Sequence, residues 1–147
     1  MADYTEKFPE VYCPLAKIDP ASYNSEQNTS RVNVGNYHRF GVLLSVGAMA
    51  GGATLDMDIE QHNAATGGTT KNITGKSITQ LTQAGSDNNS LVWVEVQCEE
   101  LDVDGGFHWV SVELTPASAA TICGVILFGA IPRYPPVPVT GWNEIVT

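Results

Sequence analysis

The sequence has few positive charges. Lysine and arginine account for 7 of the 147 residues against 16 aspartates and glutamates, which gives a formal net charge of −9 at pH 7. A protein field of this sign repels the phosphate backbone of nucleic acids and favours solubility. We therefore expect no direct binding to nucleic acid.

Long apolar runs and paired cysteines are also lacking. No segment approaches the ~18 consecutive apolar residues of a membrane span, and Met1–Glu6 has neither the basic nor the apolar region of a signal peptide. We therefore expect synthesis in a cytoplasm. We expect no membrane partner. Cys13, Cys98 and Cys123 are odd in number and have no C-x-x-C spacing, which predicts buried, reduced thiols.

Motifs of catalysis are missing as well. There is no G-x-S-x-G and no glycine-rich loop in the strand–loop–helix context of a phosphate site. Of the three histidines (His38, His62 and His108), only His62 lies near acids, and alternation places it on the polar face of a predicted strand. We expect these imidazoles to be solvated rather than to bind a metal.

One loop begins like a calcium site. Asp102–Gly106 supplies two aspartates, and Glu113 stands twelfth from Asp102, as in an EF-hand. Phe107 takes the sixth position, where an EF-hand needs glycine, and the residues after it alternate as a strand. We expect a hairpin loop here, and no metal, cofactor, catalytic residue or enzymatic activity in the chain.

What the sequence does have is period-two alternation. Leu91–Cys98 places three valines and Cys98 on one face, and Phe107–Leu114 places Val110, Val112 and Leu114 on one face. The segment Leu101–Gly106 between them is rich in aspartate and glycine. This pattern predicts two adjacent antiparallel strands joined as a hairpin.

Further strand patterns recur at short spacing and lie at Tyr37–Ala48, Ala53–Gln61, Thr69–Ile73, Ser77–Gln83 and Thr121–Ile131. About seven or eight strands without long helices predict an all-β protein, an antiparallel, jelly-roll-like β-sandwich. The last run is apolar on both faces, so we expect cover on both sides. The opposing sheet would supply one cover, and the proline-rich tail or a second subunit the other.

Prolines divide the chain into three parts: an N-terminal arm (residues 1–36), a sandwich (37–131) and a proline-rich tail (132–147). Pro9, Pro14 and Pro20 lie in the arm. Because proline lacks an N–H donor, we expect the arm to be extended and to lie outside the sheet. Its aromatic side chains then need a surface on this domain or on a neighbouring subunit.

The order of several short motifs adds a resemblance over residues 53–138. These motifs are Ala53–Met57, Gly75–Leu81, Glu100–Val103, Phe107–Val112 and Gly129–Pro136. In this order they resemble the capsid decoration, or cement, proteins of tailed bacteriophages. The resemblance implies a β-sandwich or jelly-roll body, frequent trimeric assembly and no catalytic residues.

The expected function is therefore that of a noncatalytic virion protein, which binds the outside of a phage head and bridges subunits of the major capsid protein. We expect the capsid contact to use aromatic and basic residues near the two ends: Tyr4, Phe8, Tyr12, Tyr23, Arg133 and Tyr134. We expect a homotrimer interface made by Trp109, Ile122, Ile126 and Phe128.

Two alternatives remain open at this point. Trp93 and Trp109 lie opposite the valine faces, so they could belong to the core, to a protein interface or to a sugar-binding platform. A carbohydrate-binding or host-adhesion module would use both tryptophans with Asp56 and Asp58. A tail or neck protein would have a similar fold and a low copy number.

Overall fold

The computed structural model describes residues 6–134 and 140–146. It is 52% strand and 5% helix, and its strands pair antiparallel. The helical elements of this described part are α1 (Phe8–Val11) and the 3₁₀ turn η1 (Cys98–Glu100). The strands are β1 (Tyr12–Tyr23), β2 (Gln27–Asn28), β3 (Val32–Asn33), β4 (Tyr37–Met49), β5 (Thr54–His62), β6 (Thr70–Asn72), β7 (Leu81–Thr82), β8 (Leu91–Gln97), β9 (Trp109–Ala117) and β10 (Thr121–Pro132).

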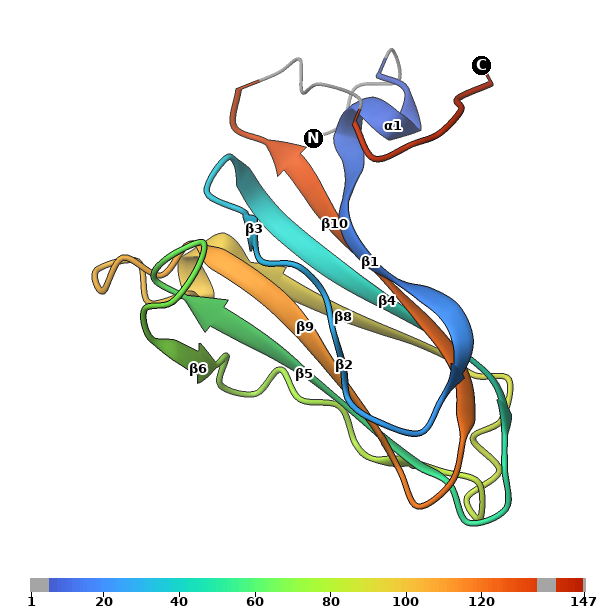
Figure 1. The fold of residues 1–147 in the computed structure, drawn as a ribbon. Helices are drawn as coiled ribbons and strands as arrows, with labels where there is room; N and C mark the ends of the chain where they lie inside the picture. The colour runs from blue at the N-terminus through green and yellow to red at the C-terminus, as the bar shows by residue number, and fades with distance from the viewer. Residues whose placement is uncertain (1–5, 135–139, 147) are drawn as a thin grey trace.

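The strands form two facing sheets (Figure 1). The four-stranded sheet has the order β1-β10-β4-β8, and the second sheet has the order β2-β9-β5-β6. In the second sheet, β3 also pairs with β9 and β7 also pairs with β5, so two short strands share each edge position. The chain crosses repeatedly from one sheet to the other, and this order is that of a jelly roll. The predicted all-β antiparallel sandwich is thus confirmed.

The core lies between the two sheets because each sheet presents one apolar face to the other. On β5, Leu55, Met57 and Ile59 are at most 1% exposed and point inward, as the alternation predicts. Phe40 and Leu127 of the four-stranded sheet, both fully buried, contribute to the same cluster. Because only the inward side chains fill the core, the outward side chains of each sheet can be apolar, polar or charged.

The predicted hairpin is wrong. β8 pairs with β4 in the four-stranded sheet, whereas β9 pairs with β5 in the second sheet. The connection between them contains η1 and the turns around Asp102–Gly106, and it crosses the edge of the sandwich. Both strands turn their alternating valines into the same core, so the pattern is the same whether the strands pair or face each other.

The expectation that the arm lies outside the sheet is wrong, because Gln27–Asn28 and Val32–Asn33 pair with β9 and Tyr12–Tyr23 pairs with β10. Tyr12–Tyr23 is β1, and it pairs with β10 along most of its length. Proline is tolerated because β1 is an edge strand, whose outward N–H groups have no ladder partner to lose. The register also shifts between Pro14 and Ala16 and between Ile18 and Ala21, which accommodates Pro20.

We predict that Phe40→Ala lowers the free energy of unfolding by about 3–5 kcal/mol, because it opens a cavity where the two sheets meet. Chemical denaturation monitored by circular dichroism measures the change. Val103→Ala is the matched control, because Val103 is 62% exposed and its loss changes stability by no more than about 0.5 kcal/mol. Equal effects of the two variants would contradict this core.

Candidate functional site

The outer face of the four-stranded sheet carries exposed apolar side chains. Residues paired across neighbouring strands share a face, and one such row is Lys17, Ile126, Leu43 and Trp93. Ile122 lies further along β10 on the same face. Trp93 is 50% exposed, Ile122 46% and Ile126 37%. Apolar side chains gathered on one side of a sheet are typical of a protein-binding surface.

A glycine positions the tryptophan on this face. A Cβ atom at Gly41 would overlap the six-membered ring of Trp93, so the ring lies across β4 where that strand has no side chain. Gly47 has the same relation to Ile122, whose Cγ2 would lie 3.2 Å from an added Cβ. The two glycines let large side chains lie close to the sheet instead of projecting from it.

Charge is balanced on this face. The Lys17 ammonium lies 2.5 Å from the Asp19 carboxylate, and Arg39 donates to Glu95 over 2.5 Å. Each cation therefore has an anion beside it at the rim of the apolar surface. Such exposed pairs add little to stability, but they leave this surface locally neutral on a chain with a net charge of −9.

The outer face of the second sheet is acidic instead. Asp58 and Glu113 stand directly opposite each other on β5 and β9, and Glu60 lies on the same face of β5. Partial burial, with repulsion from Glu26, Glu60 and Asp58, raises the pKa of Glu113. The two outer faces of the sandwich thus differ strongly in charge.

Two hollows indent the apolar face on either side of Ile126. One, of about 270 Å³, lies beside Pro20, Leu43 and Gly124. The other, of about 290 Å³, lies beside Pro14, Phe128 and Trp142. The Trp142 ring centre is 6.4 Å from that of Phe128, so the C-terminal segment covers one end of β10. The predicted second cover is present at Phe128, but Ile122 and Ile126 are left open.

The structure brings together three of the four residues assigned to the oligomer interface. Ile122, Ile126 and Phe128 share the apolar face, and Tyr12 joins them from β1, opposite Ala130. Trp109 does not, because it lies on the outer face of the second sheet, opposite His62. Trp109 and the other three residues therefore lie on opposite outer faces of the sandwich.

The residues assigned to the capsid contact are scattered. The Tyr23 hydroxyl donates to the Asp19 carbonyl over 2.6 Å, and its ring packs on the core. Phe8 and Tyr134 are 63% and 80% exposed, and the Arg133 guanidinium donates to the Tyr37 carbonyl over 3.1 Å. Tyr4 lies outside the described residues.

Sequence reasoning missed the contribution of Leu43 and Gly41 to this face. Leu43 lies in the predicted strand Tyr37–Ala48, and nothing in that pattern assigns it to a surface. The available signal was a tryptophan at an outward position of one strand, Trp93, and a glycine at an outward position of another, Gly41. Using that signal requires knowing that β4 and β8 are neighbours.

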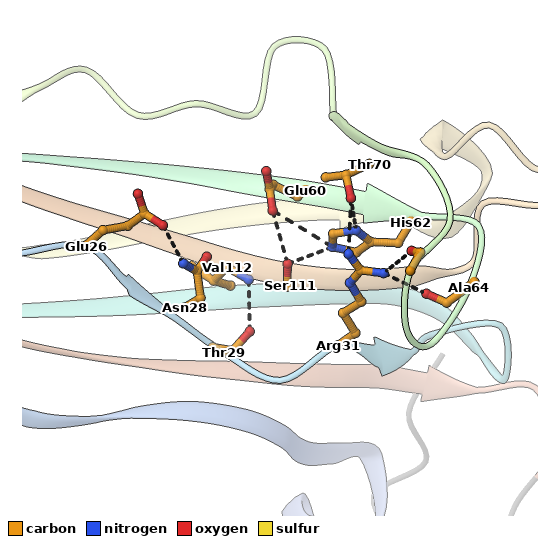
Figure 2. Close-up of polar contacts among 11 residues, drawn as sticks. Glu26, Asn28, Thr29, Arg31, Glu60, His62, Ala64, Thr70, Ser111 and Val112 are labelled. Atoms are coloured by element: carbon orange, nitrogen blue, oxygen red, sulfur yellow. Dashed lines mark hydrogen bonds and ion pairs between the residues drawn. The ribbon is translucent and has the colours of Figure 1, made fainter.

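A buried polar cluster lies at the far end of the second sheet (Figure 2). His62 is 1% exposed, with Nε2 2.7 Å from the Ser111 hydroxyl and Nδ1 2.7 Å from the Thr70 hydroxyl. Arg31 covers it and donates to the Thr70 hydroxyl and to the carbonyls of Ala64 and Gly67. The expectation that His62 is solvated is therefore wrong, because β6 and Arg31 cover this part of the outer face.

This cluster does not have the geometry of a catalytic triad. In a triad the acid orients the histidine from the nitrogen opposite the nucleophile. Here Glu60 lies on the same side as Ser111, 4.0 Å from Nε2, and Thr70 occupies Nδ1. Ser111 is itself only 4% exposed, so a substrate cannot reach it. The cluster instead satisfies buried polar groups and fixes the loop after β5.

Other candidate chemistry in the described ranges is also limited. All three cysteines are buried thiols outside any disulfide, as predicted. The Asp102 carboxylate accepts from the Gly105 amide and pairs with Lys71, so the loop closes on itself. Within residues 6–134 and 140–146, no group of three or more His, Cys, Asp or Glu side chains is arranged to hold a metal ion, and no helix has the length and apolarity to cross a membrane.

Comparisons with known proteins add little. Neither a protein-family model nor a curated protein sequence matches the chain. Among solved structures, one of the Gt strain of infectious bursal disease virus is similar at 12% identity and a TM-score of 0.29. The match covers 84% of this chain and 42% of that chain, so the present chain spans less than half of the viral one. At that TM-score the likeness carries no argument, and the fold assignment rests on the strand order.

We predict that His62 makes the protein less stable in mild acid. Burial and the neighbouring Arg31 charge lower the pKa of His62 from 6.5 to about 4. The unfolded chain therefore takes up a proton near pH 6.5 and the folded one only near pH 4, so the free energy of unfolding falls as the pH drops through this window. At pH 5 the lowered pKa of His62 reduces the free energy of unfolding by about 1 to 2 kcal/mol.

Urea denaturation at pH 7 and pH 5 tests this. His62→Gln removes the titration while keeping hydrogen-bonding groups, and it should lose less stability between the two pH values than the wild type does. His108→Gln serves as the control, because that side chain is exposed. An unchanged pH dependence in His62→Gln would contradict the assignment.

Proposed function

We propose that this chain is a noncatalytic structural protein of a virion, and that it binds other protein surfaces through the apolar outer face of its four-stranded sheet. The observation that carries the proposal is the row of exposed apolar side chains around Trp93 and Ile126, bordered by paired charges. The jelly-roll architecture is compatible, since it is used by viral capsid and lectin domains. Architecture alone does not define function, whereas an exposed apolar face indicates a protein partner.

The more specific proposal is decoration of a phage head, where the protein bridges subunits of the major capsid protein from outside. Its support is the resemblance of the motifs to phage cement proteins and the difference between the two outer faces. With the apolar face against the shell, the acidic face of the second sheet would point to solvent. There it would repel nucleic acid and other particles.

Repetition compensates for modest contacts in such a role. A shell offers the same site many times, and copies that also contact one another bind more tightly than single copies. Bridging would oppose the outward pressure of packaged DNA, because separating two capsid subunits would also require breaking the contacts with this protein. Copies would be made in the host bacterial cytoplasm and reside on the exterior of the virion.

A carbohydrate-binding module is the second candidate, and the half-exposed ring of Trp93 lying across Gly41 favours it. The platform expected for it does not form as one site. Trp109, Asp56 and Asp58 lie on the second sheet, and Trp93 lies on the four-stranded sheet. Binding on a glycan array that is lost in Trp93→Ala would favour this alternative over the structural role.

We predict that Ile126→Glu removes the protein from virions. A carboxylate in the middle of the apolar face would have to be buried without a partner in the complex, so occupancy should fall at least about tenfold. Quantitative mass spectrometry of density-purified particles gives the copy number relative to the major capsid protein. For the wild type we expect a ratio near one, or a simple fraction of it.

Val103→Glu is the matched control. It replaces another exposed apolar side chain with the same acid, but on a loop away from the face, and it should keep wild-type occupancy. A wild-type ratio of a few copies per particle would assign the protein to the tail or neck. Its absence from particles would contradict the virion role altogether.

A further inference from the structure

β8 differs from the other strands at the edges of the two sheets. The opposite edge strand, β1, contains Pro14 and Pro20 and two register shifts, and the edge strands of the second sheet are two or three residues long. β8 runs for seven residues without proline and without a register shift against β4. Proteins usually protect their sheet edges by the first set of devices, so an open edge of this length needs an explanation.

The register identifies the backbone groups of β8 that face away from β4. The Val46 amide donates to the Ser90 carbonyl over 2.9 Å. In an antiparallel ladder every second residue of a strand makes backbone hydrogen bonds to the neighbouring strand. The residues of β8 that bond to β4 are therefore Val92, Val94 and Val96. The odd-numbered residues of β8 direct their N–H and C=O groups outward.

Two interactions agree with this parity and also limit the open edge. Lys76 Nζ donates to the Glu95 carbonyl over 2.8 Å, and the Gln97 amide donates to a Glu100 carboxylate oxygen over 2.7 Å. The outward amides and carbonyls of Leu91 and Trp93 have no hydrogen-bond partner among the described residues. An open groove of about 470 Å³ runs along this flank, between Val92–Glu95 and the segment that begins at Gly75.

The side chains at the same two positions are also open. Leu91 is 71% exposed and Trp93 50% exposed, and both lie on the outer face of the sheet. The free backbone groups and the exposed side chains therefore coincide. They stand symmetrically, one residue on each side of Val92.

We propose that a second copy of this chain pairs with β8 in antiparallel orientation, about a two-fold axis at Val92. Leu91 of each copy would exchange both backbone hydrogen bonds with Trp93 of the other copy. Of the two-fold registers, this one uses all the free groups of both residues and avoids the carbonyl occupied by Lys76. It also sets a leucine against a tryptophan twice, a favourable cross-strand pair.

Charge also favours a second copy at this edge. Two chains that each carry a net charge of −9 repel one another least where their surfaces are locally neutral. Beside Trp93, Arg39 and Glu95 neutralise each other. The acidic residues of β5 and β9 lie on the other sheet and stay away from the junction.

The pairing would join two four-stranded sheets into one continuous sheet of eight strands. Because the axis is perpendicular to the sheet, both apolar outer faces would point to the same side. A two-fold axis closes with two copies, so the expected particle is a dimer and not the trimer that the resemblance implied. This inference goes beyond the proposed function, since it depends on the edge of β8 and not on what the outer face binds.

Sedimentation velocity over a range of concentrations tests the pairing. The wild type should reach twice the chain mass of 15.7 kDa. Leu91→Pro removes an outward N–H and no bond to β4, so the fold should be kept, while the dimer dissociation constant should rise at least about tenfold. Trp93→Ser keeps the backbone donor but removes the cross-strand contact, and it should also weaken the dimer.

Ile126→Glu is the control that separates the two proposals, because it alters the outer face without touching the edge and should remain dimeric. A wild type that is monomeric or trimeric at all concentrations would overturn the pairing, as would a Leu91→Pro variant that stays dimeric. Loss of virion binding by a dimeric Ile126→Glu would leave the pairing intact.

Mixed cysteine variants test the register directly. Directly opposed bonded residues have Cα atoms about 5.5 Å apart, within the range for a disulfide. A mixture of Leu91→Cys and Trp93→Cys chains should therefore form a disulfide-linked dimer on mild oxidation. Either variant alone should not, because identical positions lie on a longer diagonal. Efficient crosslinking of one variant alone would contradict the register.

Discussion

The alternation of side chains along each strand is the constraint on which the rest of this structure depends. It lets each sheet bury one face against the other, so that residues such as Phe40 and Leu55 fill the core from opposite sides. Hydrophobic burial in the core is then independent of the two outer faces. One outer face can be apolar and neutral and the other acidic, without any change in the packing between them.

The apolar outer face shows how a small sandwich can form a broad binding surface from its strands. Gly41 contributes no side chain, and Trp93 from the neighbouring strand lies in the space above it. The arrangement involves two strands far apart in the sequence, and it gives a broad ring a fixed position close to the sheet. A broad, shallow apolar surface of this kind suits a protein partner better than a small molecule, which usually needs a concave site.

The sequence predicts the features that depend on a local pattern of residues. It does not predict the features that depend on which strands become neighbours in the fold. Alternation on β5 gives both the strand and its inward face, because each inward residue is apolar and each neighbour is polar as far as Glu60. The same pattern in β8 and β9 cannot distinguish pairing in one sheet from packing across two, since both arrangements bury the same valines. For β1, the prolines predict a segment outside the sheet, but proline only restricts a strand to an edge.

The candidate site was predictable in part for the same reason. Ile122, Ile126 and Phe128 share a face because they alternate on one strand, and that relation is visible in the sequence. Trp109 was grouped with them by composition, and the sheet order separates it from them. His62 follows the polar alternation of β5 but is covered by Arg31 and Thr70, which come from distant parts of the chain.

The burial of the thiols has a consequence for their reactivity. Burial raises the pKa of Cys98 and of Cys123 to about 11 in each case. At pH 7 only about one such sulfur in ten thousand carries the negative charge needed to react with oxidants or with another sulfur. Cys13 is also buried, 2% exposed. Cys98 and Cys123 therefore react only slowly with oxidants at neutral pH, because their thiols stay protonated.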